Sequence, residues 1–281
     1  MALGPPAVRL AICCEDQPKR LQRNSALEWP AMRLAHVPGA QGDNNLLGQR
    51  GVEALPPESA PGLLISYVYL APFLKLQSRY VYRDWVLDSG AFSAHRSGVE
   101  IKLDEYIAKA RELLASDPRL TEVYALDVIG DWRASLKNTE AMWAGGVEAI
   151  PCYYAGEPWD VLVGMARDYP KVALGGMAMQ KVGAKQRWAE QCFSRIWPKK
   201  IHGFGYGAER YIKALPFHST DATSWETGPC QFGTWHGYRG AQIRGIRGSN
   251  QNLRVEVEHY LRTEREARSR WAKEMTLLET S

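Results

Sequence analysis

Short apolar runs alternate with amphipathic segments from residue 62 onward, and the two kinds of segment predict different elements. The apolar runs are typical of β-strands that are buried on both faces. The amphipathic segments place apolar residues at i, i+3 and i+4 spacing, which predicts helices with one buried face. The predicted strands are 62–70, 84–88, 122–128, 147–153, 171–175, 201–205 and 216–221. The predicted helices are 103–115, 133–144, 158–168, 184–196 and 208–214.

A repeated strand–helix–strand order predicts parallel strands joined by right-handed crossovers. We therefore expect an α/β fold, a (β/α)₈ TIM-like barrel, and the 281 residues fit the ~250 that such a barrel needs. The eighth strand could be 8–14 or 230–236. A doubly wound open sheet is the alternative architecture.

The remaining segments differ from this pattern, although we expect a single domain over residues 1–281. Residues 1–61 are rich in Pro, Gly and Asn and predict an N-terminal cap or lid with one strand, ahead of a barrel core at 62–236. Residues 237–254 form an Arg- and Gly-rich stretch without periodicity. Residues 255–281 predict a C-terminal helix that packs on the barrel or forms a dimer interface.

Composition narrows the class of protein only slightly. Hydrophobic residues make up 45% and charged residues 23%, and the formal net charge of +4 permits a nucleic-acid partner without requiring one. The five cysteines form no C-x-x-C pair, so we expect a reducing compartment. No run approaches the ~20 apolar residues of a membrane span, and we expect a cytoplasmic protein without a membrane partner.

Carboxylates and glycine turns follow the predicted strands. Asp88, Asp127 and Asp221 each stand at or near a strand end, and glycine turns occur at 175–176 and 203–207. In a barrel these positions share the rim where catalysis takes place. Carboxylates in a partly desolvated pocket can act as nucleophile and as general acid or base at a sugar carbon, and two displacements there give net retention.

Five short motifs resemble those of the tRNA-guanine transglycosylase superfamily, also called queuine tRNA-ribosyltransferases, and occur in that family's order. They are Asp-Ser-Gly-Ala-Phe at 88–92, Ala-Leu-Asp at 125–127, Leu-Gly-Gly-Met-Ala at 174–178, Gly-Phe-Gly-Tyr-Gly at 203–207 and Thr-Asp-Ala-Thr-Ser-Trp at 220–225. The resemblance covers roughly residues 62–225, and the first motif is the most specific.

The resemblance implies a role for each of the three aspartates. Asp221 would attack the anomeric carbon and hold the nucleic acid as a glycosyl ester, Asp88 would be the general acid/base, and Asp127 would read the guanine-like edge of the base. The other implied base-binding residues are Ser89, Phe92, Tyr154, Gly175, Gly176 and Met177. Among them, Phe92 and Met177 would sandwich the base, although ordinary core packing explains both equally well.

Two departures from the family pattern bear on the substrate. The tRNA enzymes carry a C-x-C-x-x-C…His zinc site after the nucleophile strand, whereas this region offers only Cys230 and His236, so we expect neither zinc nor another cofactor. The family's Gln-Gly-Gly is replaced by Tyr154-Ala155-Gly156, and Tyr153, Tyr154 or Cys152 could make the missing contact. A short chain without zinc ligands is more similar to the DpdA branch, the bacterial and phage DNA-guanine transglycosylases that insert 7-cyano-7-deazaguanine or a related base.

The segment after Asp221 predicts the nucleic-acid surface. Arg239, Arg244 and Arg247 lie among glycines and could contact phosphates, while Tyr238 could stack on an extruded base. The resemblance to the DpdA branch implies DNA as the polymer, with tRNA second, and a 7-deazaguanine base as co-substrate. A homodimer or an accessory protein is compatible with the sequence.

Three other readings of the sequence stay open. The first is a tRNA-guanine transglycosylase without zinc, and the second is an inactive nucleic-acid-binding relative. The third is a small-molecule barrel enzyme such as an aldolase, which would need a lysine at a strand end. Lys181 and Lys185 instead fall in the helix after the glycine turn.

Overall fold

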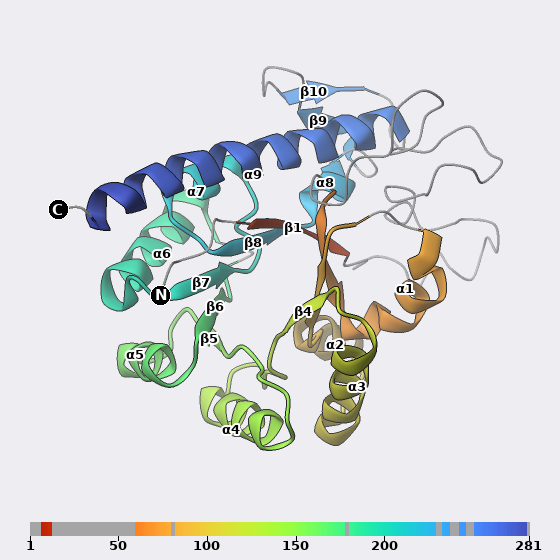
Figure 1. The fold of residues 1–281 in the computed structure, drawn as a ribbon, viewed down its shortest axis with the longest axis vertical. Helices are drawn as coiled ribbons and strands as arrows, with labels where there is room; N and C mark the ends of the chain where they lie inside the picture. The colour runs from red at the N-terminus through yellow and green to blue at the C-terminus, as the bar shows by residue number, and fades with distance from the viewer. Residues whose placement is uncertain are drawn as a thin grey trace.

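The computed structural model describes residues 7–12, 60–79, 82–177, 180–228, 232–236, 242–245 and 250–279. Eight strands form one parallel sheet in the order β4-β3-β2-β1-β8-β7-β6-β5 (Figure 1). The strands are β1 Ala7–Ile12, β2 Gly62–Ser66, β3 Trp85–Asp88, β4 Leu120–Val123, β5 Cys152–Tyr154, β6 Lys171–Gly175, β7 Lys200–Gly203 and β8 Ser219–Ala222. The predicted α/β class with parallel strands is therefore confirmed.

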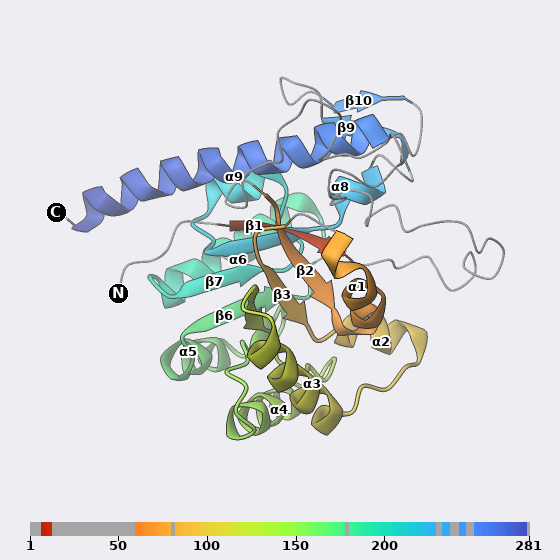
Figure 2. The same cartoon turned by 45° about the vertical axis from the view of Figure 1, so that its right-hand side comes forward.

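Helices follow most of the strands and lie outside the sheet (Figures 1 and 2). They are α1 Leu70–Leu76, α2 Ala91–Ser97, α3 Leu103–Ser116, α4 Trp132–Ala144, α5 Trp159–Asp168, α6 Val182–Ile196, α7 Glu209–Ala214, α8 Ser224–Thr227 and α9 Asn250–Glu279. Two 3₁₀ turns, Tyr67–Tyr69 and Gln77–Arg79, flank α1. None of the described helices is both long and apolar enough to cross a bilayer.

The two edge strands of the sheet, β4 and β5, approach each other. Tyr124 and Ile150 form a parallel bridge, in which Ala125 N–H donates to Ile150 O and Ile150 N–H donates to Val123 O, both at 2.9 Å. The Tyr124 ring also lies 4.8 Å from the His202 ring and 4.9 Å from the Phe204 ring, measured between centroids. Because β4 and β7 are far apart in the strand order, these contacts require a strongly curved sheet.

Apolar side chains pack on both faces of this curved sheet. One set lies inside the curve and includes Leu64, Val86, Ile150 and Ala173, all at most 8% exposed. Two larger clusters lie between the sheet and the helices, and burial of such side chains is the main favourable term in folding. The helix α4 illustrates the local signals, since the Asp131 side chain caps it by accepting the Arg133 and Ala134 N–H groups.

Several predicted boundaries are wrong at the ends of the chain. The run 62–70 contains β2, a 3₁₀ turn and the first residue of α1. An unbroken apolar run shows neither the two-residue repeat of a strand nor the 3.6-residue repeat of a helix, so the sequence does not reveal the change. Pro72 is compatible with α1 because it lies in the first helical turn. Of the two candidates for the eighth strand, 8–14 is confirmed, because β1, Ala7–Ile12, lies in the sheet between β2 and β8. The sheet therefore begins ahead of residue 62, the predicted start of the core. Within the described residues of 230–236, Thr234–His236 forms a strand, β9, which pairs antiparallel with β10, Gln242–Arg244, and is not part of the parallel sheet.

The C-terminal helix is longer than the sequence predicts. α9 begins at Asn250 and runs along the side of the sheet that carries β1 and β8 (Figures 1 and 2). It packs against α7, α8, β1 and β9. Residues 242–244 and 250–254 therefore belong to regular elements, where the sequence predicts an irregular loop across 237–254.

Candidate functional site

Three aspartates lie together at the carboxyl ends of the parallel strands. Asp88 is the last residue of β3, Asp127 follows β4, and Asp221 lies in β8. The charge of Asp221 raises the pKa of Asp88, and the charge of Asp88 raises the pKa of Asp127, so the carboxyl groups interact electrostatically. The structure thus brings the three predicted acidic residues into one site.

Asp88 starts a tight turn into α2. Its Oδ2 accepts the Gly90 N–H at 3.1 Å, and Ser89 Oγ accepts the Ala91 N–H at 3.3 Å. Gly90 has a φ of 73°, and a Cβ there would lie 2.5 Å from Ser66 Oγ, so only glycine fits. Burial raises the pKa of Asp88 to about 7, the Gly90 N–H opposes this, and Asp221 adds to it.

Asp221 has a backbone N–H donor and a nearby ammonium group that both stabilise its ionised form. It is 7% exposed, and its Oδ1 accepts the Gly205 N–H at 2.7 Å. Burial raises its pKa to about 6, while the Gly205 N–H and the Lys185 ammonium lower it. Lys185 Nζ in turn donates to Gly205 O at 2.6 Å. The glycine turn at 203–207 therefore links a buried lysine to a buried carboxylate.

Asp127 is the most strongly protonated of the three. Burial raises its pKa to about 8, although the Tyr154 hydroxyl donates to its Oδ2 at 2.6 Å and opposes the rise. Its Oδ1 is buried and accepts no hydrogen bond from the described residues. Because an unsatisfied buried oxygen is costly, this atom marks a place for a donor that the described residues do not supply.

Tyr154 covers the glycine turn at which the sequence predicts a base contact. A Cβ on Gly175 would lie 2.9 Å from Tyr154 Cε1, and one on Gly176 would lie 3.0 Å from Tyr154 Cδ1. Gly176 also has a φ of 78°. The two glycines therefore make room for the Tyr154 ring, and a base that contacts their backbone requires this ring to move.

The two residues expected to sandwich the base are placed differently. Phe92 lies in α2 just after β3 and is 48% exposed. Met177 is 6% exposed and packs in a core cluster with Tyr153, Leu174 and Tyr206. The structure therefore favours core packing for Met177 and leaves Phe92 as an exposed ring on α2, the helix that follows Asp88.

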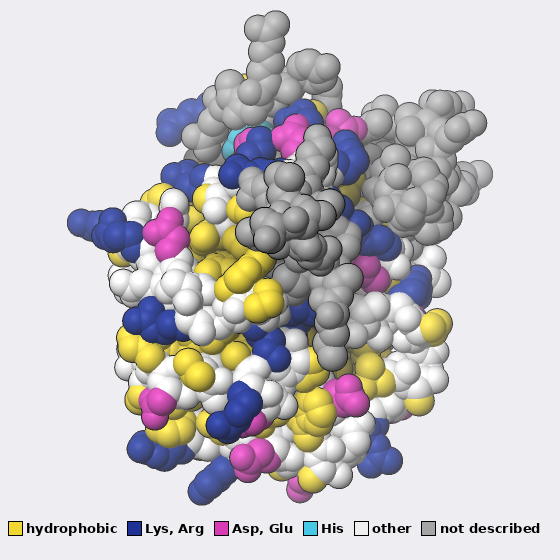
Figure 3. All heavy atoms as spheres, turned by 60° about the vertical axis from the view of Figure 1, so that its left-hand side comes forward, with side chains coloured by type: hydrophobic (Ala, Val, Ile, Leu, Met, Phe, Trp, Pro, Cys, Tyr) yellow, Lys and Arg dark blue, Asp and Glu magenta, His cyan; other side chains and the backbone are white. Residues whose placement is uncertain are grey.

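Of the four residues expected to contact nucleic acid, only Arg244 lies in the described part of the chain. It ends β10, and its side chain is exposed. Tyr238, Arg239 and Arg247 lie outside the described residues. On the face drawn in Figure 3, the visible Lys and Arg side chains are spread among apolar and acidic ones and do not gather in one area.

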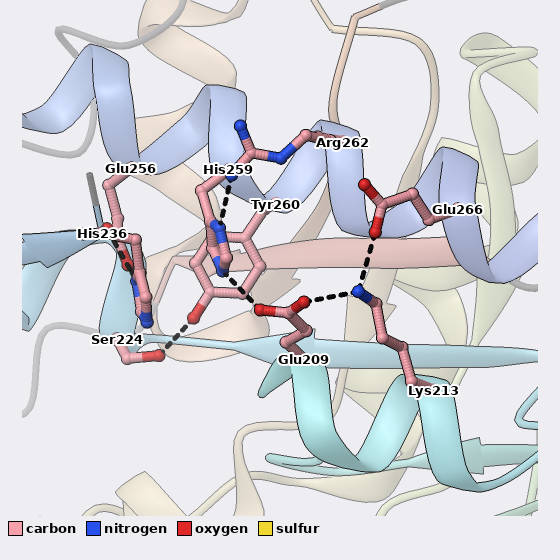
Figure 4. Close-up of polar contacts among 9 residues, drawn as sticks. All are labelled: Glu209, Lys213, Ser224, His236, Glu256, His259, Tyr260, Arg262 and Glu266. Atoms are coloured by element: carbon pink, nitrogen blue, oxygen red, sulfur yellow. Dashed lines mark hydrogen bonds and ion pairs between the residues drawn. The ribbon is translucent and has the colours of Figure 1, made fainter. Parts of the chain in front are cut away.

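A polar network fastens the β9–β10 hairpin to α9 (Figure 4). Glu256 accepts the His236 backbone N–H at 2.7 Å and lies 2.8 Å from its Nδ1. The His236 ring stacks on the His259 ring with centroids 4.0 Å apart, and His259 Nε2 lies 3.8 Å from Glu209 Oε2. This network holds the hairpin that carries Arg244, just after the strand of Asp221.

We expect Glu256→Gln to destabilise the protein more at pH 6 than at pH 9. The hydrogen bond to Glu256 raises the pKa of His236, so this stabilisation is present below pH 6.5 and is lost as pH rises through the raised value. The expected loss is about 1–2 kcal/mol at pH 6, reduced by the partial exposure of His236. Urea unfolding of the variant measures it, with Glu148→Gln, an exposed position between α4 and β5, as control. An equal loss at both pH values would contradict this account.

Sequence reasoning missed three polar residues around the aspartates. Lys185 lies in the middle of α6, His202 is in β7 with its Nε2 3.5 Å from Asp221 Oδ1, and Glu157 raises the pKa of Asp127. The buried His202 offers a signal in hindsight, because a histidine inside an apolar strand requires polar partners.

In the part of the chain that the structure describes, no group of three or more His, Cys, Asp or Glu side chains is arranged to hold a metal ion. Comparison with known proteins finds no matching family model, and no curated protein matches the chain significantly.

Proposed function

We propose that the curved sheet is a closed (β/α)₈ barrel and that the chain is a guanine transglycosylase acting on DNA. The closure is supported by the Tyr124–Ile150 bridge between the edge strands. One observation carries the function: three interacting aspartates lie at strand ends in three different environments. Titratable groups whose environments separate their pKa values divide acid and base roles among themselves.

The assignment of nucleophile follows from these environments. Asp221 has the lowest of the three pKa values, about 6, because the Gly205 N–H and Lys185 favour its charged form. Asp88, with a pKa of about 7, keeps a proton to donate near neutral pH. A nucleophile must be ionised and a general acid protonated, so Asp221 attacks and Asp88 protonates the leaving base.

The reaction proceeds by two displacements. In the first, an Asp221 oxygen bonds to C1′ of the target nucleotide, the C1′–N9 bond breaks, and the proton of Asp88 goes to the departing guanine. In the second, Asp88 takes the N9 proton of the incoming deazaguanine, whose nitrogen bonds to C1′ as the C1′–O bond to Asp221 breaks. Because each displacement inverts C1′, the product retains the original configuration.

Asp127 supplies base recognition. A guanine or 7-deazaguanine presents a ring N–H and an exocyclic amine side by side, and a carboxylate can accept from both. Because the pKa of Asp127 is about 8, it must lose its proton as the base binds, and hydrogen bonds from the two donors favour this ionised form. The buried Oδ1 of Asp127, which accepts no hydrogen bond from the described residues, accepts one from one of these donors. Exposed apolar side chains that follow the strand ends, Phe92 and Val128 among them, offer surfaces for an extruded nucleobase.

The choice of DNA rests on the resemblance to the DNA-modifying branch and on the small number of possible zinc ligands after β8. The region after β8 offers only Cys230 and His236 where the tRNA enzymes carry a set of cysteines and a histidine, which is too few ligands for a closed structural zinc site. The target base must leave the helix to reach buried aspartates, so unpaired or flipped guanines are the reactive form.

Incorporation of radiolabelled guanine and 7-cyano-7-deazaguanine into duplex DNA, single-stranded DNA and tRNA tests the proposal, with Asp221→Ala as control. Label that enters DNA and is lost in the variant is the expected result. Label that enters only tRNA would retain the chemistry and overturn the polymer. Polymer that binds without exchange would point to an inactive binding protein and overturn the enzyme proposal.

The rate of exchange should follow a narrow bell-shaped pH profile. Asp221 must lose its proton, with a pKa of about 6, and Asp88 must keep one, with a pKa of about 7. The rate therefore rises as pH approaches 6 and falls above 7. Because the two carboxyl groups interact, the two apparent pKa values of this profile describe the pair and not each residue separately. Single-turnover rates from pH 5 to 9 measure the profile. A rate that stays flat up to pH 9 would exclude Asp88 as the acid.

A further inference from the structure

A buried polar ladder runs through the inside of the sheet toward Asp221. Lys171, the first residue of β6, donates from Nζ to both carboxylate oxygens of Glu122 at 2.8 Å and to Ser219 Oγ at 2.7 Å. Ser219 Oγ lies 2.8 Å from His202 Nδ1. His202 Nε2 lies 3.5 Å from Asp221 Oδ1. The ladder therefore connects a buried ammonium group to the proposed nucleophile through two side chains.

The donors and acceptors along this ladder favour one tautomer of His202. The Lys171 ammonium can only donate, so it occupies one lone pair of Ser219 Oγ, whose own proton can go to His202 Nδ1 at 2.8 Å. The carboxylate oxygen that faces Nε2 is an acceptor and favours the same assignment, in which the ring proton resides on Nε2. Contacts with the Tyr124 and Phe204 rings, at 4.8 and 4.7 Å, hold the imidazole in this orientation.

Such a ladder is costly as a purely structural feature. Lys171 and His202 are at most 5% exposed, and apolar residues of similar size usually stabilise a buried site as well as an ion pair does. Barrel interiors are filled mainly by Val, Ile and Leu. A polar ladder that ends at an active-site carboxylate is better explained by an effect on that carboxylate.

We propose that His202 is a positioning residue for Asp221, oriented by Ser219 and Lys171, and that it directs Asp221 Oδ2 to form the glycosyl bond. This inference rests on the proposed function. Oδ1 receives the Gly205 N–H at 2.7 Å and also faces His202 Nε2 at 3.5 Å, so the backbone donor holds this oxygen and the imidazole is directed at it. The second oxygen is then the one that bonds to C1′. The 3.5 Å separation is longer than an ordinary hydrogen bond, and the proposal requires it to shorten when substrate is bound.

The same donor assists the second displacement. In the glycosyl ester, Oδ2 is bonded to C1′ and Oδ1 is the carbonyl oxygen. When the incoming nitrogen bonds to C1′, the electron pair of the C1′–Oδ2 bond returns to the carboxylate and spreads onto Oδ1. A donor at Oδ1 stabilises that charge as it develops, as donors in an oxyanion hole do. Loss of the donor should therefore slow the breakdown of the ester more than its formation.

The test compares His202→Phe, His202→Gln and Ser219→Ala with Thr220→Val, a buried control on the same strand whose side chain points to the opposite face. The first readout needs no activity: carboxyl ¹³C NMR follows the titration of Asp221, assigned by its absence in Asp221→Asn. We expect a higher titration midpoint in His202→Phe and Ser219→Ala, partial recovery in His202→Gln, which keeps an N–H donor, and no change in Thr220→Val.

The second readout is the covalent adduct, quantified on denaturing gels. In His202→Phe and Ser219→Ala the adduct should persist on the order of 10-fold longer. Unchanged Asp221 titration and adduct lifetime in folded variants would overturn the inference even if exchange occurs. If the wild-type protein exchanges no base but the Asp221 midpoint still moves in these variants, the proposed function fails while the positioning of Asp221 stands. Should His202→Phe not fold, Ser219→Ala and His202→Gln carry both readouts.

Discussion

Asp221→Asn is expected to lower the rate of base exchange by a factor of about 10⁴ or more, as removal of a covalent nucleophile does in other enzymes. Asparagine has nearly the same shape, and an amide oxygen in the Oδ1 position can still accept the Gly205 N–H that Asp221 accepts at 2.7 Å. The fold should therefore persist while the nucleophilic oxygen is lost. Exchange kinetics and trapping of a covalent protein–DNA adduct measure the effect.

The identity of the adduct separates the two carboxylates. Wild-type protein mixed with DNA should form an adduct at Asp221, located by mass spectrometry, and Asp221→Asn should form none. The control is Asp168→Asn, whose carboxylate pairs on the surface with Arg167 and should behave as wild type. An adduct on Asp88 in any of these proteins would reverse the assigned roles.

Asp127→Asn is expected to stabilise the protein at pH 8 while weakening base binding. Burial raises the pKa of Asp127 from 3.8 to about 8, so the folded protein holds this proton more tightly than the unfolded chain. The resulting stabilisation is fully present below pH 3.8 and is lost as pH rises toward and through 8. Asparagine does not titrate, so the variant should gain about 1–3 kcal/mol relative to wild type at pH 8 and show little gain near pH 4.

Urea unfolding at both pH values measures this gain, with Asp104→Asn, an exposed position in the first turn of α3, as control. Binding of the free deazaguanine base should weaken by about 10- to 100-fold, because one carboxylate-to-donor hydrogen bond of about 1.5–3 kcal/mol is lost. If the stability that the variant gains over wild type is no larger at pH 8 than at pH 4, the burial of Asp127 does not oppose its ionisation, and the account is wrong. Stability gained as activity is lost is the usual signature of a residue kept for function.

Sequence alone reveals where the aspartates of these two predictions lie, but it does not reveal their protonation states. Asp88, Asp127 and Asp221 follow apolar runs, and parallel strands carry their ends to one edge, so their grouping is predictable. Their protonation order is not, because it depends on burial and on partners from other elements. Lys185 reaches the Asp221 turn from the middle of α6, and Tyr154 reaches Asp127 from β5.

The sequence by itself determined the alternation of strands and helices, because periodicity along the chain reflects which faces are buried. It also determined the three acidic strand ends. Only the tertiary structure decided that Ala7–Ile12 is the eighth strand, that the Tyr154 ring covers Gly175 and Gly176, and that Glu256 fastens His236. Each of these depends on strand register and on contacts between residues distant in sequence, which a local pattern does not encode.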